Sequence, residues 1–192
     1  MDRARSVLIL AAILAVFLGD RAESAVTFRV SEDKLATVEF QVPKDEGARK
    51  YLGVSGRDMF RLSDINAQTV ILEIFSMYCP ICQAEAPNVN TIYRSIQSDS
   101  RLAGTVKVIG VGTGNTPFEV EIFRKKFEVP FPLFPDDNFL IQKVSQDPIR
   151  TPTFLILKME KGQKPRVHKV HVGRIENASD FVKSLSHSSR KK

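Results

Sequence analysis

The segment Phe75-Ser76-Met77-Tyr78-Cys79-Pro80-Ile81-Cys82 contains both cysteines of the chain, and two residues separate them. Residues typical of strands precede the pair and residues typical of helices follow it, so Cys79 is predicted at a helix N-terminus. The helix dipole and free backbone N–H groups there favour a thiolate. A disulfide enclosing two residues would add little stability, because the entropic gain grows with loop length. The pair therefore predicts a redox site.

A disulfide exchange site requires a nucleophilic thiolate, a second thiol that resolves the mixed disulfide, and a route for protons. Cys79 is expected to face solvent and act as the nucleophile. Cys82 lies one turn further along the helix, so we expect it to be buried and to act as the resolving thiol.

Two acidic residues are candidates for moving the proton of the resolving thiol. Glu73 lies on an apolar strand six residues before Cys79, where desolvation would raise its pKa. Glu85 follows Cys82 by three residues and shares its helix face. Each residue is also compatible with an ordinary structural carboxylate, so the assignment stays open at this point.

The hydrophobic pattern along the chain predicts an α/β fold. Residues 69–75 form a nearly continuous apolar run, which is typical of a strand buried on both faces. Pro152 precedes another apolar run and suits the start of a strand. The predicted order β, α, β, α, β, β, α implies a central mixed β-sheet flanked by helices on both faces. These elements are expected at residues 69–75, 83–96, 106–111, 116–127, 153–157, 167–172 and 178–185, with a short extended segment at 131–135 and a brief helix at 138–145.

The first residues resemble a secretory signal. Arg3 and Arg5 form a charged start, Val7 to Leu18 is unbroken apolar sequence, and small residues follow before a predicted cut near Ala25. This apolar run is shorter than the roughly 20 residues that cross a bilayer as a helix. We expect export to the periplasm or another extracytoplasmic space, with an uncleaved membrane anchor as the alternative. The predicted parts are a signal peptide at 1–24, an N-terminal extension at 25–57 with a strand at 36–42 and a short helix at 45–52, the main domain at 58–187 and a basic tail at 188–192.

Composition and charge exclude several classes of function. The 192 residues are 43% hydrophobic, which is enough for one domain with a real core. The net charge of +6 is scattered over mixed-sign segments, apart from the tail Arg190-Lys191-Lys192. No basic stripe with interleaved aromatic residues is present, so we expect no nucleic-acid binding. The sequence carries no signal for the oligomeric state.

Together these motifs resemble the thioredoxin superfamily, and more closely its TlpA/ResA-like extracytoplasmic thiol-disulfide oxidoreductases. The similarity covers roughly Met59 to Leu185. A bare C-x-x-C pair is a weak signal, but the full set in this order is specific. The set consists of Cys79-Pro80-Ile81-Cys82, Glu85 and Pro87 in the pattern C-x-x-C-x-x-E-x-P, Thr151-Pro152-Thr153-Phe154, and Gly173.

The resemblance implies a thioredoxin-like fold and several roles for individual residues. Pro152 would be cis and lie against the cysteines, and the Thr151 backbone would pair with an extended substrate. Glu73 matches the buried acid of thioredoxins, and Glu85 matches an acid found in many ResA-like proteins. The substrate surface would also include Tyr78, Pro80 and Ile81.

The resemblance also implies an activity and partners. Such proteins reduce disulfides of protein substrates outside the cytoplasm, commonly in cytochrome c maturation, and receive electrons from a membrane thiol carrier. No metal or other cofactor is expected. Two departures matter: Tyr78 stands where tryptophan is usual, and Pro80 comes first within the pair, as in DsbA-type oxidants. The second departure leaves the direction of electron flow open.

Two other functions fit parts of the sequence. A peroxiredoxin-like thiol peroxidase would use Ser76, three residues before Cys79, but the proline of that pattern is replaced by Leu72. A metal-binding chaperone would use the two cysteines with His168 and His171. A closed zinc site needs four ligands, and an offset of three in a strand turns these histidines to opposite faces.

Overall fold

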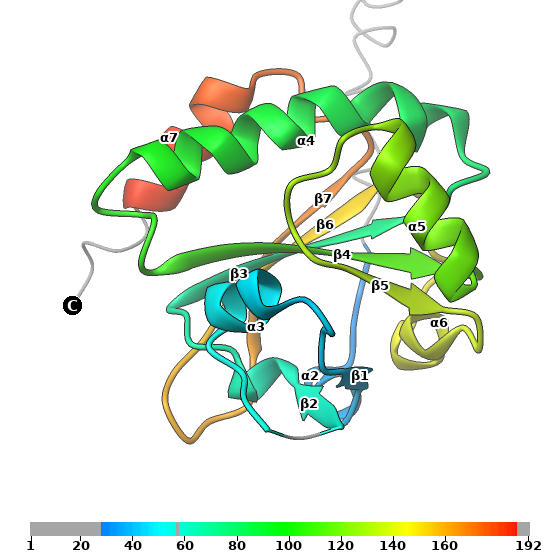
Figure 1. The fold of residues 1–192 in the computed structure, drawn as a ribbon, viewed down its shortest axis with the longest axis horizontal. Coiled ribbons are helices and arrows are strands. Elements are labelled where there is room, and N and C mark those ends of the chain that lie inside the picture. The colour runs from blue at the N-terminus through cyan, green and yellow to red at the C-terminus, as the bar shows by residue number, and fades with distance from the viewer. Residues whose placement is uncertain (1–27, 57, 188–192) are drawn as a thin grey trace, which may run out of the picture.

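A computed structural model describes residues 28–56 and 58–187 (Figure 1). The predicted signal peptide at 1–24 and basic tail at 188–192 lie outside the described residues. A five-stranded mixed sheet in the order β5-β4-β3-β6-β7 forms the centre, and helices cover both of its faces. The predicted thioredoxin-like α/β fold is confirmed. Its strands are β3 (Thr69–Phe75), β4 (Val106–Thr113), β5 (Leu133–Asp136), β6 (Thr153–Lys158) and β7 (Arg166–Val172).

The sheet is parallel on one side of its central strand and antiparallel on the other. β3 pairs in parallel with β4 and antiparallel with β6, while β4 and β5 are parallel and β6 and β7 antiparallel. The carboxyl ends of β3 and β4 therefore point to the same edge of the sheet, where α4 begins. This arrangement places the segment that follows β3, which contains the cysteines, at that edge.

Two groups of elements cover the two faces of the sheet (Figure 1). One face carries α4 (Pro80–Ser98), α5 (Pro117–Lys126) and α7 (Ala178–His187). The other face carries the N-terminal extension together with α6 (Leu140–Val144). The described elements of this second group that precede β3 are α2 (Glu32–Leu35), β1 (Glu39–Gln41), α3 (Glu46–Leu52), β2 (Met59–Arg61) and the 3-10 turn η2 (Leu62–Asp64), with β1 and β2 paired antiparallel.

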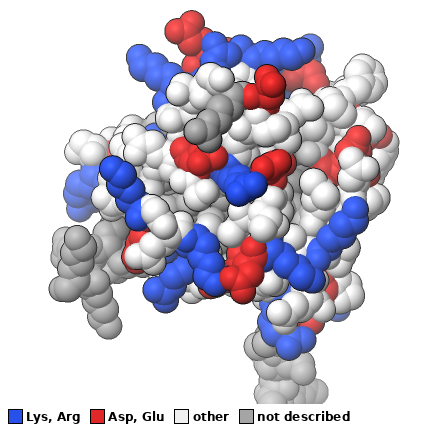
Figure 2. Space-filling view, turned by 90° about the horizontal axis from the view of Figure 1, so that it is seen from below, with Lys and Arg blue, Asp and Glu red and all other residues white. Residues whose placement is uncertain are grey.

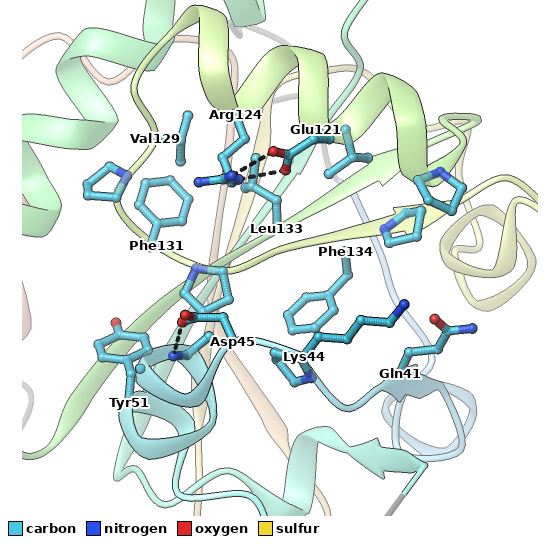
Figure 3. Close-up of a pocket in the computed structure, with 18 of the residues that line it drawn as sticks. Gln41, Lys44, Asp45, Tyr51, Glu121, Arg124, Val129, Phe131, Leu133 and Phe134 are labelled. Atoms are coloured by element: carbon cyan, nitrogen blue, oxygen red, sulfur yellow. Dashed lines mark hydrogen bonds and ion pairs between the residues drawn. The ribbon is translucent and has the colours of Figure 1, made fainter.

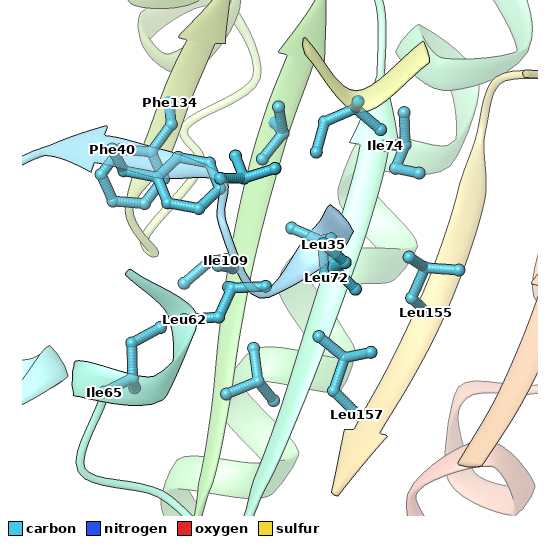
Figure 4. Packing of buried hydrophobic residues seen from close by; sticks show 14 of the residues in the cluster. Leu35, Phe40, Leu62, Ile65, Leu72, Ile74, Ile109, Phe134, Leu155 and Leu157 are labelled. Carbon is cyan, nitrogen blue, oxygen red and sulfur yellow. The ribbon is translucent and has the colours of Figure 1, made fainter. Parts of the chain in front are cut away.

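The alternation of β3 side chains divides the core into two layers. Val70, Leu72 and Ile74 pack against the extension, as Figure 4 shows for Leu72 and Ile74. Ile71 and Phe75 pack on the opposite face, against α4 and α5. Glu73 has the same parity as Ile71 and Phe75, so it lies in the layer beneath α4.

The extension differs from its prediction at one point. Residues 36–42 were expected to form a strand, but the strand covers only Glu39–Gln41 and is preceded by the one-turn helix α2. The Ser31 side chain accepts a hydrogen bond from the Lys34 amide at 3.4 Å, and Glu32 and Asp33 occupy the first turn. A hydroxyl cap and acidic first-turn residues favour helix at this position. The helix predicted at 45–52 is confirmed as α3.

Helix α4 begins at Pro80, so Cys79 lies at its N-terminus as predicted, although the apolar spacing indicated helix only from Gln83. Cys79 is its N-cap residue, and the Cys79 Sγ accepts a hydrogen bond from the Cys82 amide at 3.3 Å. Proline at the first helical position lacks an N–H that would have no partner there in any case. The C-x-x-C segment therefore forms the first turn of the helix.

A tyrosine from the extension completes the hydrogen bonding of β4. Strand β5 pairs with β4 only from Gly110 onward, so the earlier part of β4 has no strand on that side. The Tyr51 hydroxyl of α3 accepts a hydrogen bond from the Val108 amide at 2.7 Å. Burial raises the pKa of Tyr51, so this hydroxyl stays neutral. The extension is thus bound to the sheet by polar contacts as well as by apolar packing.

Charged side chains of both signs are interspersed on the described part of the face shown in Figure 2. The ion pairs among the described residues include that of Arg61 with Glu39 at 2.8 Å between β2 and β1. Among residues 28–56 and 58–187, no helix combines the length and the apolar character needed to cross a bilayer.

Candidate functional site

The two cysteines occupy unlike environments at the start of α4. Cys79 is partly exposed, whereas Cys82 is fully buried in the apolar layer between α4 and the sheet. Both are present as free thiols. The Cys79 Sγ lies 3.3 Å from the Thr151 carbonyl oxygen, which comes from the loop before β6.

This difference in environment separates the acidities of the two thiols. Partial burial acts to raise the pKa of Cys79, but hydrogen bonds from the Thr151 and Cys82 side chains and from the Cys82 and Ile81 amides outweigh it. The net pKa of Cys79 lies below its ordinary value. Desolvation raises the pKa of Cys82 to about 12. Cys79 therefore ionises first, and Cys82 needs a base to ionise.

The loop before Cys79 is held by side chains from two other elements. The Met77 amide donates to Asn115 Oδ1 at 2.8 Å, and the Met77 carbonyl accepts from Gln83 Nε2 at 2.7 Å. The Tyr78 hydroxyl donates to Glu119, which also belongs to the capping box at the start of α5. The start of α5 therefore fixes the position of the Cys79 loop.

None of Gln83, Asn115 and Glu119 was predicted from the sequence as part of the site. The Thr116-Pro117 start of α5 was visible in the sequence, but the contact with a loop 38 residues away was not. Asn115 is fully buried, and it directly precedes Thr116, the N-cap residue of α5. The side-chain amide of a buried asparagine near a helix start can hydrogen-bond the backbone of a neighbouring loop. The local sequence pattern does not reveal which loop that is.

Exposed apolar side chains adjoin the nucleophile. Tyr78 is 65% exposed and Ile81 is 51% exposed, and Pro80 between them is also exposed. Phe118 is 74% exposed and precedes Glu119, the hydrogen-bond partner of Tyr78. Tyr78, Pro80 and Ile81 thus form exposed surface next to Cys79 in the chain.

The loop before β6 has the geometry that the resemblance implies. The Thr151–Pro152 peptide bond is cis, which confirms that part of the expectation for Pro152. Pro152 is buried, and its carbonyl accepts a hydrogen bond from the Gly173 amide at 2.8 Å. Gly173 adopts a φ of 91°, which favours glycine because it has no Cβ. This contact joins the proline loop to the end of β7.

Glu73 is a buried carboxyl group without a full set of partners. It is 2% exposed, and its Oε1 has no hydrogen-bond partner among the described residues. Desolvation, with a further contribution from the charge of Glu85, raises the pKa of Glu73 to about 8. A carboxyl group with such a pKa can both accept and return a proton near neutral pH.

Glu85 is also buried, but three donors surround it. Arg174 Nε lies 2.9 Å from Glu85 Oε2, and the Ile175 amide lies 3.0 Å from Oε1. Asn88 Nδ2 donates to Oε1 at 2.7 Å. The structure thus brings both predicted acids under α4 and gives them unequal partners. Arg174 and Asn88 were not predicted from the sequence.

The histidines considered for a metal site have other contacts. His171 Nε2 lies 2.7 Å from the Arg174 carbonyl oxygen, and its ring lies 6.0 Å from that of Phe154. Within residues 28–56 and 58–187, no three His, Cys, Asp or Glu side chains converge as metal ligands.

A separate cleft of about 760 Å³ lies between the extension and the α5–β5 region (Figure 3). Its walls include Tyr51 from α3, Arg124 paired with Glu121 on α5, and Phe131 and Phe134 near β5. The cleft is lined by neither cysteine and by neither of the two predicted acids.

Residues 32–156 match the model of the family described as the AhpC/TSA family. The chain belongs to the AhpC/TSA family. The AhpC/TSA match begins inside the segment that we expected to be an extension, and it ends within β6. It therefore includes α2, β1 and α3 as well as the cysteine segment.

Curated relatives of this AhpC/TSA member include ResA proteins. The thiol-disulfide oxidoreductase ResA of Geobacillus thermodenitrificans (strain NG80-2) is 30% identical over 112 residues, which are 58% of this chain and 60% of that protein. ResA of Bacillus subtilis (strain 168) is 29% identical over 96 residues, half of each chain. The chain spans between half and 60% of the length of these relatives. The resemblance to ResA-like proteins is confirmed.

Solved structures support the fold of this AhpC/TSA member. A thiol-disulfide isomerase from Corynebacterium glutamicum has a TM-score of 0.51 and 22% identity, over 81% of this chain and 96% of that chain. A secreted Mycobacterium tuberculosis disulfide oxidoreductase has a TM-score of 0.54 and 14% identity, over 82% of this chain and 99% of that chain. At these identities the likeness concerns the fold alone.

Proposed function

We propose that the protein is an extracytoplasmic thiol-disulfide oxidoreductase that exchanges disulfides with protein substrates through Cys79 and Cys82. The observation that carries the proposal is the asymmetry of the two thiols. Cys79 is partly exposed at a helix N-terminus with a lowered pKa, and Cys82 is buried with a pKa of about 12. A nucleophile and a resolving thiol need these opposite environments.

The proposed reaction reduces the substrate. The Cys79 thiolate attacks one sulfur of a substrate disulfide, so a mixed disulfide forms and the other substrate sulfur leaves as a thiolate. Glu73 takes the proton of Cys82, whose thiolate then attacks Cys79. The second substrate sulfur leaves and both substrate thiolates take up protons. Two electrons have passed to the substrate, and the protein holds a Cys79–Cys82 disulfide.

We propose that the substrate binds across the proline loop and the exposed residues of the C-x-x-C turn. The Thr151 carbonyl, whose oxygen lies 3.3 Å from the Cys79 sulfur, would accept a backbone hydrogen bond from an extended segment of the substrate. Pro152 would pack beside the disulfide. Tyr78, Pro80 and Ile81 would contact the residues next to the substrate cysteine, since all three are exposed.

The reductive direction and the location are part of the proposal. They are supported by the similarity to ResA-like proteins and by the apolar segment Val7 to Leu18 near the N-terminus. In an oxidising compartment a reductase needs a continuous supply of electrons. We propose that a membrane thiol carrier reduces the Cys79–Cys82 disulfide and that cytochrome c maturation is the process served.

The test is an insulin reduction assay that uses dithiothreitol as the electron source, combined with trapping of substrates. The wild-type protein should accelerate insulin reduction. Cys82→Ser should form stable mixed disulfides through Cys79, and these can be identified by mass spectrometry in extracts of the host. The matched variant Cys79→Ser should trap none. Equal trapping by the two variants, or a wild-type protein without effect on insulin, would refute the assignment.

The same protein preparation tests the peroxidase alternative. The Ser76 Oγ on which that alternative depends accepts a hydrogen bond from the Tyr78 amide at 3.4 Å. We expect the reduced protein to consume hydrogen peroxide no faster than a free thiol does in stopped-flow measurements. A much faster reaction would favour the peroxidase.

A further inference from the structure

Three exposed aromatic side chains are carried by loops at the edge of the sheet where α4 begins. Tyr78 precedes α4, Phe118 lies in the first turn of α5, and Phe139 lies between β5 and α6. They are 65%, 74% and 52% exposed. Every other Phe and Tyr among residues 28–56 and 58–187 is buried or half-buried. Tyr78, Phe118 and Phe139 together form what we call the aromatic surface.

Hydrogen bonds join the loops that carry the aromatic surface. The loop before α4 is bound to the start of α5 by the contacts of Met77 with Asn115 and of Tyr78 with Glu119. The end of β5 is bound to the same segment, because the Asp136 amide donates to the Asn115 carbonyl at 3.2 Å. In Figure 1, α6 and the arrowheads of β4 and β5 lie at the edge where α4 starts. The three aromatic residues therefore belong to neighbouring segments at the edge that carries the nucleophile.

Phe139 is held in an unfavourable backbone conformation. Its φ of 55° lies in the left-handed region, where the Cβ of most residues is crowded and glycine or asparagine is usual. The ring of Phe139 lies against Gly114, where an added Cβ would be 2.7 Å from two ring carbons. The ring is thus fixed in place by a glycine that leaves room for it.

Little in the fold compensates for this strain. About half of the Phe139 side chain is exposed, and it makes no capping hydrogen bond to α6. The Asp136 carboxyl group fills that role, since it accepts hydrogen bonds from the amides of Leu140 at 2.6 Å and Ile141 at 3.1 Å. Asparagine would adopt the same φ at a lower cost. A strained aromatic residue that is also exposed points to a role in binding.

The nucleophile lies between two different kinds of surface. In the sheet order β5-β4-β3-β6-β7, the proline loop precedes β6, whereas Phe118 follows β4 and Phe139 follows β5. The two surfaces therefore flank the segment after β3 from opposite sides. One side presents the Thr151 carbonyl, 3.3 Å from the Cys79 sulfur, and the other presents aromatic rings. An extended substrate bonded to the first through its backbone would direct side chains towards the second.

We infer that Phe118 and Phe139 are specificity-determining residues that, together with Tyr78, bind apolar side chains next to the disulfide of the substrate. This inference rests on the proposed function and deepens it, because it names a substrate class. That class consists of polypeptides whose reactive cysteine is flanked by apolar residues, above all aromatic ones. Rigid rings offer a large apolar contact at a low cost in conformational entropy. A cysteine between polar residues would gain little from this surface.

The test compares the attack of Cys79 on two matched peptides. Each peptide has one cysteine in a mixed disulfide with thionitrobenzoate, flanked on both sides by phenylalanine in one peptide and by serine in the other. Attack on the peptide sulfur releases thionitrobenzoate, whose absorbance gives a rate constant by stopped flow. Each rate constant is divided by that of glutathione with the same peptide. The wild type should favour the phenylalanine peptide about tenfold, because one aromatic contact contributes roughly two- to tenfold.

Variants of the two phenylalanines assign this selectivity. Phe118→Ser and Phe139→Asn should each lower the ratio about twofold or more, and the double variant should bring it close to one. Phe139→Tyr keeps a ring and should keep the wild-type ratio. The melting temperature of Phe139→Asn should not fall, because asparagine accepts this φ. Met59→Ser is the matched control, since Met59 is an exposed apolar residue of β2 on the other face of the sheet, and it should also keep the ratio.

Several results would overturn the inference. One is a wild-type ratio near one, and another is a wild-type ratio that persists in the double variant. A lower melting temperature of Phe139→Asn with an unchanged ratio would assign this residue a purely structural role. Self-association of the wild type in sedimentation equilibrium that Phe118→Ser abolishes would assign the aromatic surface to a second copy of the chain. A wild type that reacts with neither peptide faster than glutathione does would instead refute the proposed function itself.

Discussion

The two faces of the central sheet are built from different kinds of side chain. On the face beneath the extension, β3 contributes Val70, Leu72 and Ile74, which are all fully buried and apolar. On the face beneath α4, the same strand contributes Glu73 between two apolar residues. Burial of an incompletely paired carboxyl group destabilises the folded state, whereas burial of apolar side chains stabilises it. Both faces carry an apolar layer that stabilises the fold, but the layer beneath α4 also holds a buried carboxyl group at a cost in stability.

The largest effect that separates the two faces should come from Cys79→Ser. The nucleophile is lost, so insulin reduction should fall to the uncatalysed rate. The partly exposed side chain has few packing contacts to lose, so the free energy of unfolding should change by less than about 1 kcal/mol. Urea denaturation and the insulin assay measure the two quantities. A large loss of stability would mean that the reactive site also supports the fold.

Leu72→Ala should have the opposite effect. The side chain is fully buried in the layer beneath the extension, and its truncation should lower the free energy of unfolding by about 2–5 kcal/mol. The rate at which Cys79 reacts with an alkylating reagent should stay at the wild-type value, because the cysteine lies on the other side of the sheet. A changed alkylation rate in the folded variant would show that the two faces are coupled.

Glu73 should make stability depend on pH. Its pKa is about 8 in the folded protein and near 4.5 in the unfolded chain, so between these values the folded state binds the extra proton. The free energy of unfolding should therefore fall as pH rises from about 4.5 to 8, by roughly 2–4 kcal/mol in total. Urea denaturation of wild type and Glu73→Gln across this range measures the difference. The variant should lack this part of the slope.

The smallest effect is expected at the exposed end of the site. Tyr78→Phe removes the hydroxyl that bonds Glu119 but keeps the apolar ring beside Cys79. Because the hydrogen bond is exposed to solvent, kcat/KM for insulin reduction should change by no more than about fivefold. Glu119→Gln is the matched variant from the other partner. A loss as large as that of Cys79→Ser would show that the start of α5 controls the nucleophile.

Local pattern was sufficient for the elements that carry the chemistry. Strand β3 has the bounds predicted from the apolar run at 69–75, because a strand buried on both faces is almost continuously apolar. The positions of Cys79 and Cys82 at the start of α4 also follow from local sequence. The missed helix α2 depended on a capping group, Ser31, whose effect is visible only once its partner, the Lys34 amide, is known.

The residues missed at the site share one property. Arg174 contacts Glu85 across 89 positions of sequence, and Asn115 contacts Met77 across 38. Such contacts arise from the topology of the sheet, which brings the ends of β3, β4 and β7 together. A single sequence gives the chemical type of each residue but not its distant partner, so an exposed arginine after a strand was indistinguishable from any other surface charge.

The bond between Tyr51 and Val108 has a consequence for the whole molecule. The hydroxyl occupies the place that a further length of β5 would otherwise fill, and it closes an amide that would be open to a strand from another molecule. A chain that lost α3, through proteolysis or truncation, would keep its cysteines, but this part of the β4 edge would be open to pairing with a strand of another molecule. The extension therefore covers a part of the β4 edge that β5 leaves unpaired.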